Sequence, residues 1–212
     1  SIAMVSIIKG YDRILAVSSK SSQDKIDMLK SMGAKVYVCP AHVSADDPRS
    51  YYEVAKRLHE ETEGSIYINQ YFNELNIEAH YRTTGPEIWH DTKGKVTHFV
   101  SAMGTTGTIM GTSTYLKEKN NDIQIVGVQP TENSSIPGIR KWPQAYLPEI
   151  FDAKKVDRTI EVSEDEARHM ARELSSKEGI FSGMSSGGAA TAALKLAATL
   201  DSGVIVSIVC DR

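Results

Sequence analysis

The strongest constraint on the fold of this chain is the regular alternation of strand-like and helix-like segments. Short apolar segments of strand length lie at residues 13–17, 35–39, 65–69, 96–102, 123–128, 159–162 and 204–209. Segments with helical start and stop signals lie around and between them, at residues 1–9, 21–33, 47–61, 79–90, 109–119, 163–179 and 187–200. Strands that alternate with helices predict parallel sheets covered by helices. The expected fold class is therefore α/β.

The alternating segments fall into two groups. A length of 212 residues suits one large or two small domains. We expect a smaller αβ domain at residues 1–78 and a larger one at residues 79–212. Ligands of such folds collect where parallel strands end and at domain interfaces, so the loops after strands are the first candidates for a site.

Composition and charge exclude several classes of partner. The chain has 24 basic and 27 acidic residues and no basic tract, which argues against nucleic acid. Its apolar runs are too short to cross a membrane. The two cysteines do not make a disulfide scaffold, and neither CxxC nor HExxH occurs, so we expect no metal site. Two reduced thiols are typical of a cytoplasmic protein.

A glycine-rich turn between a strand and a helix is the sharpest local signal. It consists of Gly104, Thr105, Thr106, Gly107 and Thr108. Backbone N–H groups of such a turn converge on an anion, and the following helix adds its positive dipole end. The turn is neither a P-loop nor GxGxxG, so it favours a single phosphate monoester over a nucleotide. An ordinary tight turn is an equally good reading of these five residues alone.

A second pattern, Gly183-Met184-Ser185-Ser186-Gly187, matches the GxSxG nucleophile elbow of hydrolases. In that fold a histidine base follows the serine along the chain, whereas all six histidines here precede Ser185. A serine hydrolase is therefore disfavoured. The alternative is a helix N-terminus capped by a serine, which is compatible with a ligand contact.

Two polar residues are candidates for substrate binding. Gln70 follows the predicted strand at 65–69, where an amide can hold a carboxylate. Arg140 lies in a long loop, residues 129–153, that carries four of the seven prolines. Loops of this length inside a domain are more often functional than idle, and an arginine fork can clamp an anion.

Four stretches together resemble the fold-type II pyridoxal-phosphate (PLP) enzymes, and within them the cysteine synthases. They are residues 83–89 (TTGPEIW), 104–108 (GTTGT), 135–148 (SIPGIRKWPQAYLP) and 178–188 (EGIFSGMSSGG). The third stretch resembles the B-type cysteine synthase, whereas residues 46–58 and 70–71 are also similar to cystathionine β-synthase. The resemblance spans essentially the whole chain. It implies two parallel-sheet domains of the tryptophan synthase β type.

The resemblance implies a role for each matching residue. Those that match the loop holding the PLP phosphate are Gly104, Thr105, Thr106, Gly107 and Thr108. Ser185 matches the serine that hydrogen-bonds the pyridine nitrogen. Gln70 matches a glutamine near the substrate carboxylate, and Arg140 matches an arginine at the mouth of the B-type site.

No residue of this chain matches the Schiff-base lysine of the family. That lysine and the asparagine-bearing substrate loop are expected upstream of Ser1, and the family pattern continues past Arg212. We therefore assign no catalytic lysine within the chain.

The activity implied by the resemblance is β-replacement. An activated serine, O-acetylserine or O-phosphoserine, would exchange its β-substituent for a sulfur donor to form cysteine. The resemblance also implies a homodimer. The alternatives are a β-replacement of the cystathionine β-synthase kind and an inert fragment or phosphate-binding module.

Overall fold

The structure is a computed structural model that describes residues 2–142 and 147–210. The chain divides into two compact units, Ser1–Ile68 and Asn69–Arg212. Each unit contains its own parallel sheet with helices, which confirms the predicted α/β class. The division into domains at residue 78 stays a prediction.

The first unit has a sheet of two parallel strands, β1 (Ile14–Ser18) and β2 (Lys35–Cys39). The unit also contains three helices: α1 (Ile2–Lys9), α2 (Gln23–Ser31) and α3 (Tyr51–Glu60). Helix α2 ends shortly before Gly33, whose φ of +78° favours glycine. The predicted order of helices and strands is thus confirmed up to α3.

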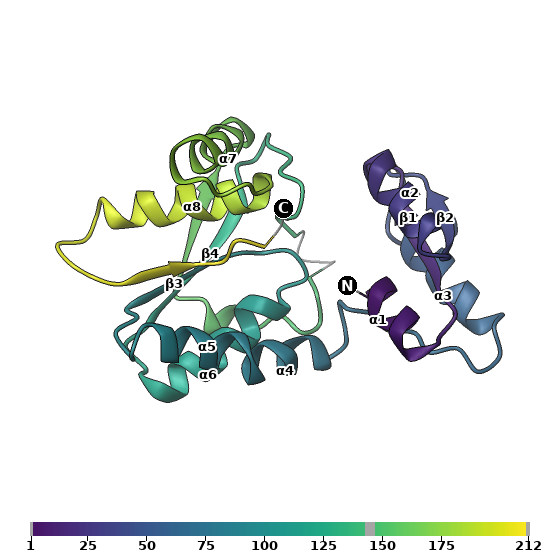
Figure 1. The fold of residues 1–212 in the computed structure, drawn as a ribbon, viewed down its shortest axis with the longest axis horizontal. Helices are drawn as coiled ribbons and strands as arrows, with labels where there is room; N and C mark the ends of the chain where they lie inside the picture. Colours follow the sequence, from purple (N-terminus) through teal and green to yellow (C-terminus); the bar gives the residue numbers. More distant parts are fainter. Residues whose placement is uncertain (1, 143–146, 211–212) are drawn as a thin grey trace. The chain divides into compact units, whose positions relative to one another are not determined.

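The second unit has a sheet of four parallel strands in the order β5-β4-β3-β6. Helices α7 and α8 lie on one face of this sheet, and α4, α5 and α6 lie on the other (Figure 1). The strands are β3 (His98–Ala102), β4 (Gln124–Pro130), β5 (Arg158–Val162) and β6 (Ile205–Ser207). The helices are α4 (Leu75–Arg82), α5 (Thr84–Asp91), α6 (Gly107–Lys119), α7 (Glu164–Glu178) and α8 (Met184–Ala197), with a short 3-10 helix, η2 (Ala153–Lys155).

The two faces of the larger sheet have separate hydrophobic cores. Phe99 and Val100 are neighbours in β3, and both are fully buried. Because successive strand side chains point to opposite faces, Val100 packs with Ala192 and Leu196 of α8, whereas Phe99 packs with Ile109 of α6. A strand with buried side chains on both faces is typical of a parallel sheet that helices cover on both sides.

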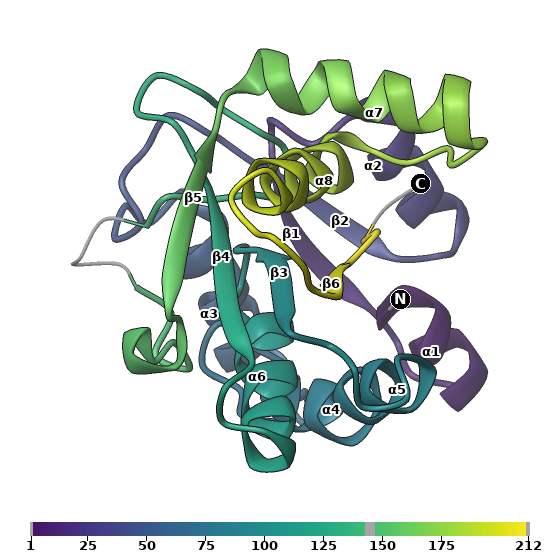
Figure 2. The ribbon, with the colours of Figure 1, turned by 90° about the vertical axis from the view of Figure 1, so that its left-hand side faces the viewer.

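The strand ends of the second unit direct four connecting segments to one edge of the sheet. Since β3, β4, β5 and β6 are parallel, the segments after Ala102, Pro130, Val162 and Ser207 all leave from that edge (Figure 2). Polar residues in these segments can therefore meet although they are far apart in the sequence.

The predicted strand at residues 65–69 is wrong. These residues have no regular secondary structure, and Ile66 and Ile68 are exposed. Ser65 is instead held by α3, where its hydroxyl donates to the carbonyl of His59 and also bonds the His59 ring. Alternating apolar residues make a strand only where a neighbouring strand accepts their backbone hydrogen bonds, and within the described chain no strand pairs with them.

Three helix boundaries also differ from the prediction. The helix expected at 79–90 is two helices that meet at Thr83, and Pro86 lies in the first turn of α5, where its missing N–H is tolerated. Helix α3 begins after Ser50, whose hydroxyl caps it, and not at Asp47-Pro48. Helix α8 begins at Met184, three residues before Gly187.

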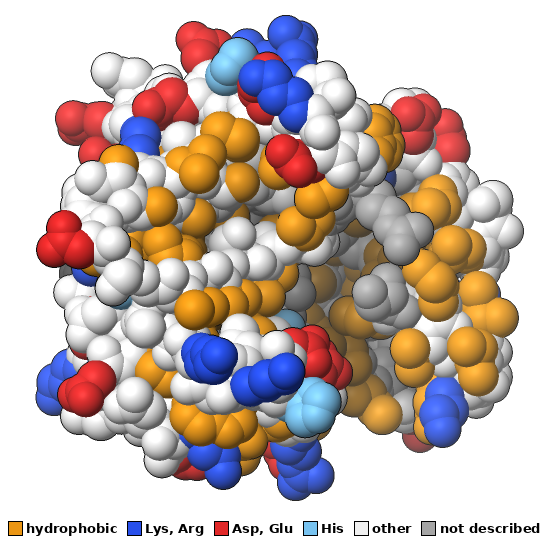
Figure 3. Space-filling model, turned by 60° about the vertical axis from the view of Figure 1, so that its left-hand side comes forward, with side chains coloured by type: hydrophobic (Ala, Val, Ile, Leu, Met, Phe, Trp, Pro, Cys, Tyr) orange, Lys and Arg blue, Asp and Glu red, His pale blue; other side chains and the backbone are white. Residues whose placement is uncertain are grey.

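Several large hydrophobic side chains are exposed in the second unit. They include Phe72, Leu75, Phe181 and Leu194, and the space-filling view shows hydrophobic side chains on the surface of the face that it presents (Figure 3). Where such side chains form a contiguous patch, they often mark a contact with further protein. None of the described helices combines the length and the apolar character needed to span a bilayer.

Candidate active site

The glycine-rich turn leaves the carboxyl end of β3 and leads directly into α6. Thr106, the N-cap of α6, has a left-handed φ of 72°, and no side chain caps the helix. Among the described residues, none accepts a hydrogen bond from the backbone N–H groups of residues 104–109, and the first helical bond runs from Met110 N to Thr106 O. We call residues 104–109 the amide cup. Unpaired donors at the positive end of a helix of 13 residues form an anion site.

A buried hydroxyl in the cup has no partner. Thr106 is 4% exposed, and its Oγ1 is buried without a hydrogen-bond partner in the described part of the chain. A buried hydroxyl left unpaired is costly, so such a group points to a ligand that completes its hydrogen bonding. A phosphate, which only accepts hydrogen bonds when fully ionised, fits this set of donors.

Asn76 of α4 fixes the turn from one side. Its Nδ2 donates to Thr105 Oγ1 at 3.2 Å and to the backbone oxygen of Gln70 at 2.9 Å. A Cβ on Gly107 would lie 2.1 Å from Asn76 Oδ1, so only glycine allows this approach. The same close packing continues at Gly111, where a Cβ would meet Ile77 O at 2.2 Å.

His80 of α4 links the cup to α5. Its Nε2 lies 3.1 Å from Thr108 Oγ1, and its Nδ1 lies 2.9 Å from Thr84 Oγ1. Burial lowers the pKa of His80, because a charged imidazole is disfavoured away from water. A neutral imidazole between two hydroxyls orients Thr108 without adding a charge.

Ser185 lies in the first turn of α8 and is buried. A Cβ on Gly138 would lie 3.0 Å from Ser185 Cβ, and a Cβ on Gly104 would lie 3.1 Å from Gly138 O. Gly138 therefore lies close to both the amide cup and Ser185, between the two. Ser185 Oγ lies 3.5 Å from the sulfur of Cys210, which follows β6.

Arg140 and Gln70 are linked to the cup through neighbouring residues, Arg140 through Trp142 and Gln70 through Asn76. Arg140 is exposed, and its guanidinium carbon lies 5.0 Å from the ring centroid of Trp142 and 5.9 Å from that of Tyr71. The Gln70 side chain is exposed, and its backbone oxygen is joined to the cup through Asn76. Both predicted substrate residues thus lie in the second unit with the cup, and their roles stay predictions.

A cavity of about 260 Å³ lies in the first unit, and a larger one of about 610 Å³ lies beside the Arg140 loop. The larger cavity is lined by Pro130, Thr131, Glu132, Ser134, Ser135, Ile139, Arg140, Lys141 and Trp142. Lys141 forms an ion pair with Glu161 at 2.7 Å.

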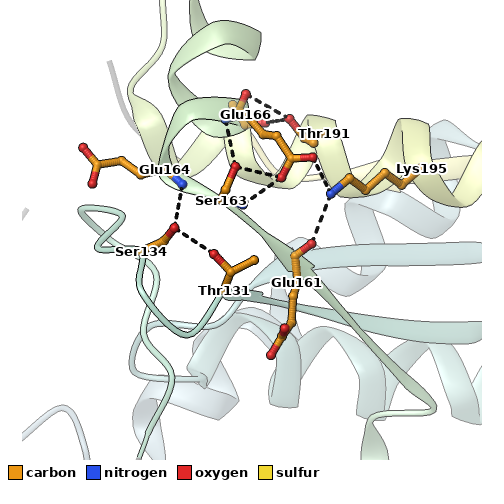
Figure 4. A network of polar contacts seen from close by, with 9 residues as sticks. Thr131, Ser134, Glu161, Ser163, Glu164, Glu166, Thr191 and Lys195 are labelled. Carbon is orange, nitrogen blue, oxygen red and sulfur yellow. Dashed lines mark hydrogen bonds and ion pairs between the residues drawn. The ribbon is translucent and has the colours of Figure 1, made fainter.

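A polar network anchors the wall of this cavity (Figure 4). Thr131 donates to Ser134 Oγ at 2.7 Å, and Ser134 Oγ accepts from the backbone of Glu164 at 3.1 Å. Next to it, Ser163 and Glu166 form the predicted capping box of α7, and Lys195 of α8 bonds Glu166 at 2.7 Å. The network joins the ends of β4 and β5 to helices α7 and α8. The wall of the cavity is therefore fixed by hydrogen bonds to regular secondary structure.

Three residues of the site were not predicted from the sequence: Asn76, His80 and Trp142. Trp142 donates from Nε1 to Gly104 O at 2.8 Å. A lone asparagine, histidine or tryptophan has no local pattern that distinguishes it. The one available signal was the pair Gly107 and Gly111 in a helix, since glycines four residues apart mark a face that another helix approaches closely.

This fold and site define a class of enzyme: the chain belongs to the pyridoxal-phosphate dependent enzyme family, which matches residues 1–211. Within that family it is of fold type II, in the cysteine synthase group. It is 48% identical to cysteine synthase B of Pseudomonas aeruginosa over 212 residues, which is all of this chain and 70% of the relative. It is 42% identical to cysteine synthase B of Salmonella typhimurium, over all of this chain and 69% of the relative.

A more distant relative is cystathionine β-synthase of Saccharomyces cerevisiae. It is 36% identical over 211 residues, which cover 92% of this chain and 42% of that protein. The predicted fold class, enzyme family and cofactor are confirmed, whereas the roles of single site residues stay predictions. Family membership removes the hydrolase alternative, and no described histidine hydrogen-bonds Ser185.

Proposed function

We propose that this chain carries the cofactor-binding part of an enzyme that forms cysteine by β-replacement. The substrate is an activated serine, O-acetylserine or O-phosphoserine, and the second substrate is a small sulfur donor. The similarity to two cysteine synthases B over the whole chain supports the reaction. The amide cup supports the cofactor.

One observation carries the proposal: the amide cup has unpaired donors on a strand-to-helix turn. The N–H groups of the cup and the buried hydroxyl of Thr106 would hold the PLP phosphate. Asn76 and His80 hold the side chains of Thr105 and Thr108 in place at the cup. The packing of glycines against α4 holds this arrangement rigid.

Bound PLP supplies an electron sink that permits loss of a β-substituent from an amino acid and addition of a sulfur nucleophile. In our proposal Ser185 faces the pyridine nitrogen. A neutral hydroxyl does not force that nitrogen to be protonated, as a carboxylate would, which favours rapid elimination. Burial of Ser185 keeps water from competing for this hydrogen bond.

Arg140 is proposed to bind the anionic part of a substrate. Its planar guanidinium is held beside Trp142 and Tyr71, so little rotational freedom is lost when an anion binds. It should favour thiosulfate, or a phosphorylated serine, over neutral co-substrates. Replacing it removes a charge-assisted hydrogen bond worth about 1.5–3 kcal/mol, or about ten- to a hundredfold in kcat/KM.

The test is Arg140→Ala in the holoenzyme, assayed with thiosulfate and with sulfide. We expect a large loss with thiosulfate and a small loss with sulfide. Lys141→Ala is the matched control, because it removes the adjacent positive charge, which is already paired with Glu161. Equal losses with both donors, or an equal effect of Lys141→Ala, would contradict the role of Arg140.

Cystathionine β-synthase activity is the second candidate, supported by the 36% identity to the yeast protein. The higher identity to the cysteine synthases makes it the weaker one. The two are separated by the preferred nucleophile: an inorganic sulfur donor for cysteine formation, and a thiol amino acid for the alternative. A preference for the thiol amino acid would overturn the first proposal.

A homodimer and a cytoplasmic location are further proposals. The exposed side chains of Phe181 and Leu194 support an interface between copies of the protein. Sedimentation of the holoenzyme tests the first, with a monomer at micromolar concentration as the contrary result. Cell fractionation tests the second, with recovery outside the cytoplasmic fraction as the contrary result.

A further inference from the structure

Two consecutive carbonyl groups at the start of the amide cup are held by one neighbouring segment. Met103 O accepts from the backbone N–H of Arg140 at 2.8 Å, and Gly104 O accepts from Trp142 Nε1, also at 2.8 Å. The first bond is formed by backbone and is independent of side-chain type. The second depends on the indole of Trp142.

These bonds also fix the direction of the next two N–H groups. A peptide unit is planar and trans, so its C=O and N–H point in opposite directions. With the Met103 and Gly104 oxygens turned toward the Arg140–Trp142 segment, the N–H groups of Gly104 and Thr105 must point away from it. Neither N–H has an acceptor in the described part of the chain.

We propose that Trp142 is a positioning residue for the cofactor phosphate. Its indole N–H holds the Gly104–Thr105 peptide so that Thr105 N–H faces the anion and Gly104 O faces away. A carbonyl oxygen turned toward the phosphate would repel it, so this orientation both adds a donor and removes an acceptor. The inference rests on the proposed function of the cup.

The chemistry of tryptophan suits this role. Indole Nε1–H is a donor only, so it satisfies a carbonyl and offers no lone pair to compete for cup N–H groups. The ring is half-buried and is held edge-on by Tyr71 at 5.7 Å between centroids, with the Arg140 guanidinium over it. The indole is therefore fixed before the cofactor binds, and its contribution is preorganisation.

The test compares Trp142→Phe with Trp89→Phe, since the chain has two tryptophans. Trp89 packs beside the core between α5 and α6, outside the cup. Two quantities are measured: the ³¹P chemical shift of the cofactor phosphate in the holoenzyme, and the PLP affinity of the apoenzyme. We expect Trp142→Phe to move the ³¹P signal and weaken PLP binding about three- to tenfold, the value of one hydrogen bond, while Trp89→Phe changes neither.

A second variant guards against a folding effect of the substitution. In this variant the tryptophan analogue benzothienylalanine replaces Trp142, in the Trp89→Phe background so that position 142 is the single tryptophan site. The analogue keeps the shape of the ring and removes only the N–H. It should reproduce both effects of Trp142→Phe. Unchanged ³¹P shift and affinity with this isostere would overturn the inference.

Thr108→Val separates this inference from the proposed function, because it removes a cup hydroxyl directly. If Thr108→Val moves the ³¹P signal and the two changes at position 142 do not, the cup stands and the role of Trp142 is refuted. If none of them moves it, the cup assignment itself fails, and the inference fails with it.

Discussion

Replacing Gly107 by alanine tests the closest contact of the site. The new Cβ would lie 2.1 Å from Asn76 Oδ1, 2.3 Å from its Cγ and 2.7 Å from its Nδ2. The amide of Asn76 must therefore move and lose its bonds to Gln70 O and Thr105 Oγ1. At about 0.5–1.5 kcal/mol for each hydrogen bond, the free energy of unfolding should fall by about 1–3 kcal/mol.

Urea-induced unfolding followed by circular dichroism measures this loss. With a slope of about 1–3 kcal/mol per molar urea, the midpoint should fall by about 1 M. The control is the same substitution in an Asn76→Ala background. All three atoms that the new methyl group meets are then absent, so Gly107→Ala should cost almost nothing there.

The double-mutant cycle isolates the contact between these two residues. We expect a coupling free energy close to the whole cost of Gly107→Ala. If Gly107→Ala costs the same with Asn76 as without it, the close approach of α4 and α6 at this point is not the reason for the glycine. The reasoning would then be refuted, whatever the size of the loss.

Three further predictions concern single groups. In the holoenzyme, Ser185→Asp should protonate the pyridine nitrogen and slow turnover; unchanged activity would contradict the assigned role. Burial lowers the pKa of His80, so the unfolded chain binds more protons than the folded chain as the pH falls below about 6.5. The free energy of unfolding should therefore decrease as the pH falls through that range. His80→Gln should reduce this dependence of stability on pH, measured by urea titrations at several pH values. The pKa of the Glu166 carboxyl is lowered, first by its bond to Lys195 and then by the Ser163 backbone. The folding stability that the ionised carboxylate contributes is therefore present above about pH 4.5 and is lost as the pH falls below that value. Lys195→Met should weaken this pH dependence, and an unchanged pH profile of stability would be the contrary result.

Much of the fold could be predicted because local sequence patterns report local structure. Glycines such as Gly33, serines such as Ser163 and short apolar segments such as the one around Val126 act within a few residues. The cup was also predictable, since a glycine turn between a strand and a helix needs no distant partner. The strand at residues 65–69 failed because a strand requires a paired neighbour, which no local pattern specifies.

The sequence by itself determined the α/β class, most of the helices and strands, and the position of the glycine-rich turn that forms the amide cup. Only the tertiary structure decided which side chains serve that cup. Asn76, His80 and Trp142 lie about 30 to 40 residues from their partners along the chain and meet them because parallel strands and closely packed helices bring distant segments to one edge of the sheet. Periodicity specifies which face of an element is buried, whereas the partner of a polar side chain depends on the packing of whole elements.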